Sequence, residues 1–344
     1  MHLGSRIGLG TAPLGSAEDG PLWWGPQDRA TAVATVRAAL DAGITWVDTA
    51  PFYGWGRAEE IVGEAVRGRR DEVTILTKCG TVRRPDGSWA DDGSPAAIRA
   101  DLEASLTRLG TDRVDVLQLH DPDPDVAVEE SVGAMAELVA EGKVRHVGLS
   151  NHDVDLLERG AAVAPIAAVQ HQWSILHHPP EADAARRWCE EQDARFLGWS
   201  PLASGFLVDG FDPGATAAGD LRRRLPWATG DGARRLAEVG AEAAAAGRSV
   251  RDYALAWASA TSYSIVGART PDEARALAAP PSSAIRAARS SRCSGWTGRR
   301  PWRPRTRPPR TPTPCADPEP PGGVLAGGAA SARASSGVRA PTME

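Results

Sequence analysis

Short apolar stretches with the composition of β-strands alternate along the first 279 residues with longer, alanine-rich segments. In these longer segments apolar positions recur every three or four residues, which is typical of a helix that packs one face against a core. The eight strand-like stretches begin at Ile7, Ile44, Val73, Val114, Val144, Ile166, Arg195 and Tyr263. Four of the helices are predicted over Arg29–Leu40, Ala58–Arg67, Pro95–Leu109 and Val126–Ala140.

Eight strands that alternate with helices predict a single (β/α)8 TIM barrel, a fold of the α/β class, over residues 1–279. The competing fold is the doubly wound dinucleotide-binding sheet, whose first strand runs into a Gly-x-Gly-x-x-Gly turn. Residues 8–13 read Gly-Leu-Gly-Thr-Ala-Pro and lack the third glycine, which favours the barrel.

The composition is typical of a globular protein and shows no pattern of a membrane-spanning or metal-binding protein. The 344 residues are 42% apolar and 24% charged, with a net charge of −5, as in an ordinary globular protein. No apolar run approaches the ~18 residues of a membrane-spanning helix, and the N-terminus has no signal-like apolar stretch. The four cysteines are far apart and the seven histidines form no HxH or HExxH pattern, so we expect no metal site. These features indicate a cytoplasmic enzyme without a membrane partner.

Residues 280–344 differ from the rest of the chain. They hold eleven arginines, three acidic residues and 12 of the 27 prolines, a net charge of +8 that leaves −13 for the first 279 residues. Such a segment buries too little apolar surface to offset the entropy of ordering, so we expect a disordered tail. It lacks the motifs and interleaved aromatic residues of nucleic-acid binders. Our hypothesis is a frameshifted reading of GC-rich DNA, since only two of the chain's 39 basic residues are lysines.

Four side chains of catalytic potential follow the second, third and fourth predicted strands. Asp48 and Tyr53 follow the second strand, Lys78 ends the third and His120 follows the fourth. The carboxyl ends of barrel strands form the face that holds the active site in TIM barrels. Each residue alone has an ordinary structural explanation, as a turn former, a packing ring or a hydrogen-bonded core residue. Lys78 is harder to explain in this way, because a buried lysine needs a partner such as Asp48.

These four side chains suit proton transfer to a carbonyl group. The Lys78 ammonium is expected to lower the pKa of Tyr53, which for a free tyrosine is about 10. Asp48 would fix Lys78 and limit the cost of burying it. A tyrosine tuned in this way can protonate a carbonyl oxygen while hydride reaches the carbon, and a neutral His120 can orient the carbonyl.

The sequence resembles the aldo-keto reductase superfamily from the first strand to about residue 279. The matching motifs are Gly10-Thr11-Ala12, residues 48–54 (DTAPFYG), Thr77-Lys78, residues 112–115 (DRVD), Gln118-Leu119-His120, residues 142–145 (GKVR), residues 148–151 (GLSN), Val169-Gln170, residues 199–207 (WSPLASGFL) and Gly267-Ala268-Arg269. The resemblance implies Tyr53 as proton donor, tuned by Asp48 and Lys78, with His120 orienting the carbonyl. It also implies a last helix and a substrate loop after residue 279, so the composition of the tail would endanger closure of the barrel.

The resemblance further implies NADPH as the cofactor. The residues implied to contact it are Ser150, Asn151, Gln170 and Trp199 around the nicotinamide, and Ser200, Leu202, Gly205, Gly267, Arg269 and Glu273 along the phosphates and adenosine. Trp199 takes the place of an aromatic residue that stacks on the nicotinamide ring. Arg269 takes the place of the residue that binds the 2′-phosphate, to which its planar guanidinium is suited. Glu273 stands where a glutamine is usual, and its carboxylate would repel a phosphate.

Trp24, Trp55 and Trp89 in predicted loops would form apolar walls of a substrate pocket, which suits aldehydes and ketones of modest size. The predicted function is therefore NADPH-dependent reduction of small carbonyl compounds. One alternative is a lyase in which Lys78 forms a Schiff base with substrate, although an ammonium paired with Asp48 is a poor nucleophile. The other is a non-catalytic NADPH-binding regulatory subunit, which an intact tetrad also permits.

Overall fold

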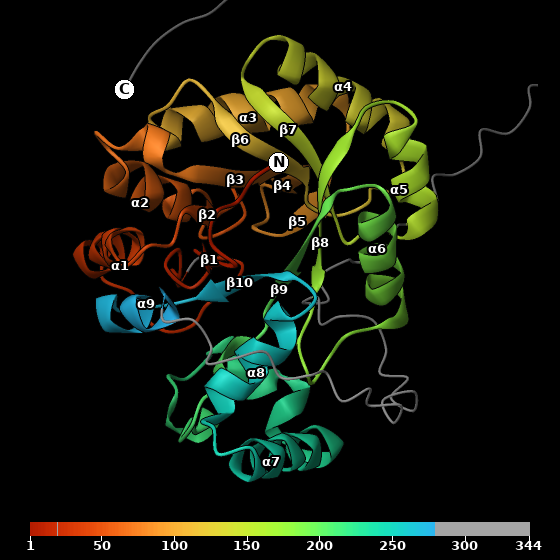
Figure 1. Ribbon diagram of the computed structural model, residues 1–344. Helices are drawn as coiled ribbons and strands as arrows, with labels where there is room; N and C mark the ends of the chain where they lie inside the picture. Colours follow the sequence, from red (N-terminus) through yellow and green to blue (C-terminus); the bar gives the residue numbers. More distant parts are fainter. Residues whose placement is uncertain (19, 279–344) are drawn as a thin grey trace, which may run out of the picture. The chain divides into compact units, whose positions relative to one another are not determined.

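Eight parallel strands close into a barrel in the computed structural model, which describes residues 1–18 and 20–278 (Figure 1). The strands are β1 (Ile7–Gly10), β2 (Trp46–Asp48), β3 (Thr74–Cys79), β6 (Val114–Leu119), β7 (Val144–Ser150), β8 (Ile166–Gln172), β9 (Arg195–Trp199) and β10 (Tyr263–Gly267). All eight predicted strands are present and the predicted TIM barrel is confirmed. The sheet closes within the described residues, because β10 pairs with β1. The tail and the last helix predicted after residue 279 lie outside the described residues.

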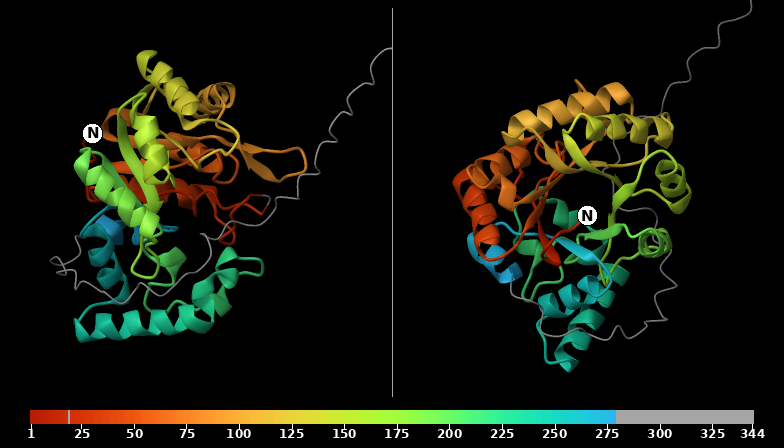
Figure 2. Two further views of the ribbon diagram at one scale, coloured as in Figure 1. Left: turned by 90° about the vertical axis from the view of Figure 1, so that its right-hand side faces the viewer. Right: turned by 45° about the horizontal axis from the view of Figure 1, so that its top comes forward.

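Helices surround the barrel and cover the outer face of its sheet (Figure 2). They are α1 (Arg29–Asp41), α2 (Arg57–Ala65), α3 (Pro95–Leu109), α4 (Val128–Ala140), α5 (Val154–Ala161), α6 (Pro180–Glu191), α7 (Gly230–Ala245), α8 (Val250–Ser259) and α9 (Pro271–Ala278). Short 3-10 helices are η1 (Arg70–Glu72), η2 (Ala203–Gly205), η3 (Pro213–Ala215), η4 (Leu221–Arg224) and η5 (Pro226–Ala228). The four predicted helices agree to within two residues at each end. None of the helices described here is both long and apolar enough to cross a membrane.

The amino-terminal end of the barrel is filled by one large side chain. Trp46 of β2 is fully buried, packs with Leu3 inside the barrel and donates its indole N–H to the Ser5 carbonyl at 2.9 Å. Gly8 of β1 makes room for it, because a Cβ at that position would lie 2.3 Å from the Trp46 ring. The barrel is therefore a packed core at this end, and the active sites of TIM barrels lie at the opposite, carboxyl end of the strands.

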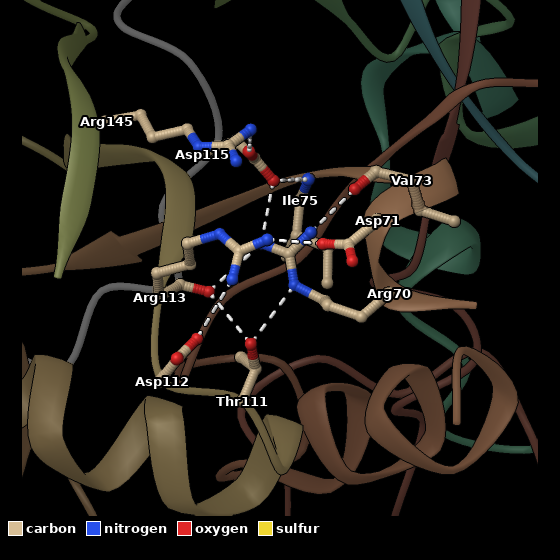
Figure 3. A network of polar contacts seen from close by, with 9 residues as sticks. All are labelled: Arg70, Asp71, Val73, Ile75, Thr111, Asp112, Arg113, Asp115 and Arg145. Carbon is tan, nitrogen blue, oxygen red and sulfur yellow. Dashed lines mark hydrogen bonds and ion pairs between the residues drawn. The ribbon is translucent and has the colours of Figure 1, made fainter. Parts of the chain in front are cut away.

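A network of charged groups ties the starts of three strands together at the same end (Figure 3). The buried Asp115 of β6 accepts hydrogen bonds from Arg70, from Arg145 of β7 and from the backbone N–H of Ile75 in β3, at 2.8, 2.8 and 2.9 Å. Arg70 also donates to the Arg113 carbonyl at 3.0 Å. The acidic residue at the end of the 112–115 motif therefore serves the fold, because it satisfies backbone and arginine donors where the strands enter the barrel.

A two-stranded hairpin that the sequence pattern did not predict follows β3 and stands out from the barrel in Figure 2. It consists of β4 (Thr81–Arg83) and β5 (Trp89–Asp91), paired antiparallel. Both of its ends are anchored. The Gly80 N–H donates to the Asp101 carboxylate of α3 at 2.8 Å, and the Gly93 N–H donates to Asp123 at 2.9 Å. The hairpin therefore holds a defined position beside the end of β3.

Replacing Asp101 by asparagine is expected to stabilise the protein at pH 8. Burial raises the pKa of Asp101 to about 6, although the Gly80 N–H lowers it. A carboxyl group whose folded pKa exceeds its unfolded value of about 3.9 destabilises the fold above pH 6, and this penalty disappears as pH falls toward 4. Asparagine keeps an acceptor for Gly80 without the charge. Urea denaturation should show a gain of roughly 1–2 kcal/mol at pH 8 that vanishes near pH 4. Asp112→Asn, at an exposed site, should show no such gain.

Candidate active site

A buried ion pair lies at the carboxyl ends of β2 and β3. Lys78 Nζ is 2.6 Å from Asp48 Oδ1, and the two side chains are 0% and 2% exposed. Lys78 Nζ also donates to the Thr49 carbonyl at 3.0 Å and lies 4.9 Å from the centre of the Tyr53 ring. The Tyr53 and His120 rings meet edge to face with their centres 6.0 Å apart. The four residues singled out in the sequence therefore come together around one point.

The pKa of Tyr53 is shifted in the direction opposite to the one predicted from the sequence. Removal of water from the hydroxyl raises this pKa and is the largest influence; Lys78 lowers it, and Asp48 raises it again. The net direction is upward, so the predicted lowering is wrong, because burial and the carboxylate outweigh the ammonium. For Lys78, burial lowers the pKa, but Asp48 and Tyr53 more than compensate and raise it overall. At neutral pH, Tyr53 carries its proton and Lys78 its charge.

Two glutamines hold the other oxygen of Asp48. Gln170 and Gln118 donate to Asp48 Oδ2 at 2.9 and 3.2 Å, and Gln170 also donates to Gln118 Oε1 at 3.2 Å. A Cβ at Gly148 would lie 2.8 Å from Gln118 Cγ, so this glycine of β7 makes room for the Gln118 side chain. Gln118 was not predicted as a site residue. Its signals in the sequence are its place in the Gln118-Leu119-His120 motif and its position two residues before His120 on a strand whose alternate residues face the barrel interior.

Aromatic rings form one wall of the site. The Phe52 ring meets the rings of Trp55, Trp89 and His120 edge to face, with centres 5.5, 5.3 and 5.8 Å apart. Trp55 and Trp89, two of the predicted pocket residues, therefore belong to the same ring cluster as His120, which each of them reaches through Phe52. Trp24 packs elsewhere, against the apolar cluster beneath the segment that follows β9.

The predicted nicotinamide residues lie at the ends of β7, β8 and β9. Ser150 ends β7 and is buried, and Asn151 follows it with a left-handed φ of 64°. The Trp199 indole N–H donates to Asn151 Oδ1 at 3.3 Å, and Asn151 Nδ2 donates to Asp121 at 2.9 Å. In the order of strands around the barrel, β8 lies opposite β2, after which Phe52 and Trp55 follow. These side chains and Gln170 therefore lie across the barrel from the aromatic wall.

The segment after β9 has an unusual backbone. Ser200, Ala203, Ser204 and Gly205 all have positive φ angles, of 57°, 48°, 60° and 99°. Leu202 lies within this turn, and its carbonyl accepts from the N–H groups of Gly205 and Leu207. Non-glycine residues adopt this conformation rarely, and such clusters are typical of functional sites.

Arg222 lies beside this turn and was missed in the sequence, where the run of arginines at 222–224 is typical of a solvated surface. The buried Asp220 holds Arg222 through two hydrogen bonds, of 2.9 and 2.6 Å. A Cβ on Gly205 would lie 3.8 Å from Arg222 Nη1. Burial and the nearby Arg222 lower the pKa of Arg269, so two guanidinium groups share this region.

Arg269 follows β10, which ends at Gly267, and it donates to the loop after β1. Its guanidinium bonds to the carbonyls of Trp24 and Pro26, both at 2.6 Å, and to the side chain of Gln27 at 3.1 Å. Glu273 accepts from the Arg269 backbone N–H at 2.7 Å, and its own N–H donates to Thr270 Oγ1 at 3.2 Å. This exchange of hydrogen bonds at the start of α9 is a helix cap, which explains the acid at 273.

Comparison with known proteins agrees with this arrangement. The sequence profile of the Aldo/keto reductase family matches residues 6–280. The chain is 36% identical over 230 residues to the aldo-keto reductase YhdN of Bacillus subtilis, across 64% of this chain and 66% of that protein. Overall, it spans 57–66% of the length of the curated relatives that it matches first.

Two solved structures share the fold. A glycerol dehydrogenase from Gluconobacter oxydans superposes with a TM-score of 0.72 at 30% identity, over 82% of this chain and 88% of that one. An aldo/keto reductase from Klebsiella pneumoniae, solved in complex with NADP and acetate, has a TM-score of 0.62 at 30% identity, over 81% and 87%. Since the family profile covers the barrel from its first strand to its last described helix, this chain belongs to the aldo/keto reductase family.

Proposed function

We propose that this chain is an NADPH-dependent reductase that converts the carbonyl group of aldehydes or ketones to an alcohol. The observation that carries the proposal is the fully buried Lys78–Asp48 pair beside the Tyr53 ring. A fold tolerates two buried charges at this position only with matched partners, and here Thr49, Gln118 and Gln170 supply them.

Each residue of the tetrad has one task. Tyr53 donates its proton to the carbonyl oxygen, and its raised pKa keeps that proton in place at neutral pH. The Lys78 ammonium stabilises the phenolate that is left, because opposite charges attract strongly where water is excluded. Asp48 fixes Lys78, and His120 orients the carbonyl by a hydrogen bond. NADPH, when bound, supplies the hydride that the carbonyl carbon receives.

The residues present fit this cofactor. Arg222 lies beside the turn at 200–205 and its charge acts on Arg269, so a phosphate group there would add a counter-charge to those of Asp220 and Glu273. Arg269 now bonds to neutral carbonyls, and a charged phosphate is the stronger acceptor. Gln170 Nε2 is engaged by Asp48, so its Oε1 would accept from the nicotinamide carboxamide. The Klebsiella pneumoniae relative was solved with NADP, which supports the same choice here.

A Schiff-base lyase suits this site poorly. Lys78 Nζ is held at 2.6 Å from Asp48 and its side chain is 0% exposed, so the nitrogen is charged and out of reach of a substrate. A regulatory NADPH-binding subunit would use the same residues, and steady oxidation of NADPH by benzaldehyde would separate a reductase from it.

Titration with NADPH is expected to quench the tryptophan fluorescence saturably, because Trp199 would lie against the nicotinamide ring. Trp199→Phe should lose much of that quenching. Trp188→Phe, in α6 and away from the barrel mouth, is the matched control and should keep it. An equal loss in both variants, or quenching that never saturates, would remove the support for this cofactor site.

A further inference from the structure

A guanidinium group lies at the outer end of the aromatic wall. Arg83 is the last residue of β4, exposed, and paired in register with Trp89 of β5. Its guanidinium carbon lies over the Trp55 ring, 5.2 Å from the centre. Among residues 1–18 and 20–278, no carboxylate forms an ion pair with Arg83, although most arginines of the barrel have such a partner.

The rings between this cation and the tetrad are continuous. Arg83 rests on Trp55, Trp55 contacts Phe52, and Phe52 contacts His120, with ring centres 5.5 and 5.8 Å apart. His120 in turn contacts Tyr53. A molecule whose carbonyl lies at Tyr53 and His120 would therefore run along an aromatic surface toward Arg83.

The arrangement is held by the backbone on both sides. Trp55 has a left-handed φ of 51°, between Gly54 at 64° and Gly56 at 96°. A bulky residue adopts this conformation only where its surroundings impose it, and here it turns the indole against Phe52 and under Arg83. On the other side, Asp101 and Asp123 anchor the two ends of the hairpin that carries Arg83.

We propose that Arg83 is a specificity-determining residue that binds the carboxylate of an anionic carbonyl substrate. This inference rests on the proposed reductase function and adds its substrate class, an aldehyde or ketone with a carboxylate on an aromatic or apolar body. A guanidinium stacked on an indole keeps the N–H groups at its edge free, and these match the two oxygens of a carboxylate. The rings of Trp55, Phe52 and Trp89 would cover the body of the substrate.

The test compares two aldehydes with the same aromatic body, the anionic 4-formylbenzoate and its uncharged methyl ester, with saturating NADPH. The readout is the ratio of their kcat/KM values. We expect the wild type to favour the carboxylate, and Arg83→Gln to lower that ratio roughly tenfold, as expected for loss of a charge-assisted hydrogen bond. Arg83→Lys should restore part of it. Arg84→Gln, the neighbouring arginine of the same hairpin, is the matched control and should keep the wild-type ratio.

A ratio that Arg83→Gln leaves unchanged, or that Arg84→Gln lowers equally, would overturn the assignment. A second measurement separates it from the proposed reaction. Binding of benzoate to the NADPH-loaded protein, followed by tryptophan fluorescence, should be about tenfold weaker in Arg83→Gln than in the wild type and in Arg84→Gln. If neither aldehyde is reduced but benzoate binding depends on Arg83, the result supports the anion site and contradicts the reductase function. If benzoate binds equally to the wild type, Arg83→Gln and Arg84→Gln, the result contradicts the anion site.

Discussion

Tyr53→Phe is expected to lower kcat for aldehyde reduction by a factor of roughly 10²–10⁴, which is the usual contribution of a positioned general acid. NADPH affinity should change little, because the hydroxyl is assigned to the substrate oxygen and not to the cofactor. Steady-state kinetics with benzaldehyde and fluorescence titration with NADPH measure the two quantities. Equal losses in kcat and in NADPH affinity would argue against the proton-donor role.

Tyr263→Phe is the matched control. Tyr263 begins β10 at the opposite end of the barrel, where Arg6 lies over its ring, and its replacement should leave kcat within a factor of about two. The wild-type pH profile gives an independent check. Since the net pKa of Tyr53 in the free protein is raised above its usual value of 10, kcat/KM for reduction should stay level through pH 9 and fall only above pH 10.

Breaking the Lys78–Asp48 pair on one side is expected to cost about 3–5 kcal/mol of unfolding free energy. Lys78→Met leaves the Asp48 carboxylate buried with only glutamine donors, and Asp48→Asn leaves the Lys78 ammonium buried without a counter-charge. The double variant Asp48→Asn/Lys78→Met leaves no buried charge and should be more stable than either single variant. Urea denaturation of the four proteins forms a double-mutant cycle that measures this coupling.

The other lysine of the chain supplies the control for this cycle. Lys143 pairs with Glu103 at 2.5 Å, but on the surface, with side chains 34% and 50% exposed. Lys143→Met should therefore change the unfolding free energy by no more than about 1 kcal/mol. Additive losses in the Asp48/Lys78 cycle would show that the two charges do not depend on each other, which the buried geometry forbids. All three variants of the pair should lack reductase activity.

Most of the barrel could be predicted from the sequence because its strands are buried on both faces. Such strands are nearly continuous apolar runs, and the helices between them show a 3.6-residue period, so both are visible locally. The hairpin of β4 and β5 was missed because its strands have three residues each and are half-exposed, which leaves no apolar alternation to detect. The anchors Asp101 and Asp123 that fix it are supplied by later segments.

The candidate site was predicted in part for the same reason. Residues at strand ends are placed by the fold itself, so Asp48, Tyr53, Lys78 and His120 could be brought together from their positions alone. Gln118 and Arg222 could not be assigned to the site in this way, because only their contacts with residues far away in the sequence show that they belong to it. Gln118 bonds to Asp48, seventy positions away, and Arg222 is identified by its closeness to Gly205 and Arg269.

The pKa shifts of the site residues and the surroundings of its charged groups depend on the tertiary structure alone. The sequence predicted correctly that Lys78 lowers the pKa of Tyr53. The net direction of that pKa is upward because Asp48 and the exclusion of water from the hydroxyl both raise it, and no local pattern contains the extent of that exclusion. The same holds for Arg83, an ordinary loop arginine in the sequence that the folded chain places over Trp55. Order along the chain therefore determined the barrel and the ends of its strands. Burial and contacts between distant segments, which exist only after folding, determined the charge states and the partners of the side chains at those ends.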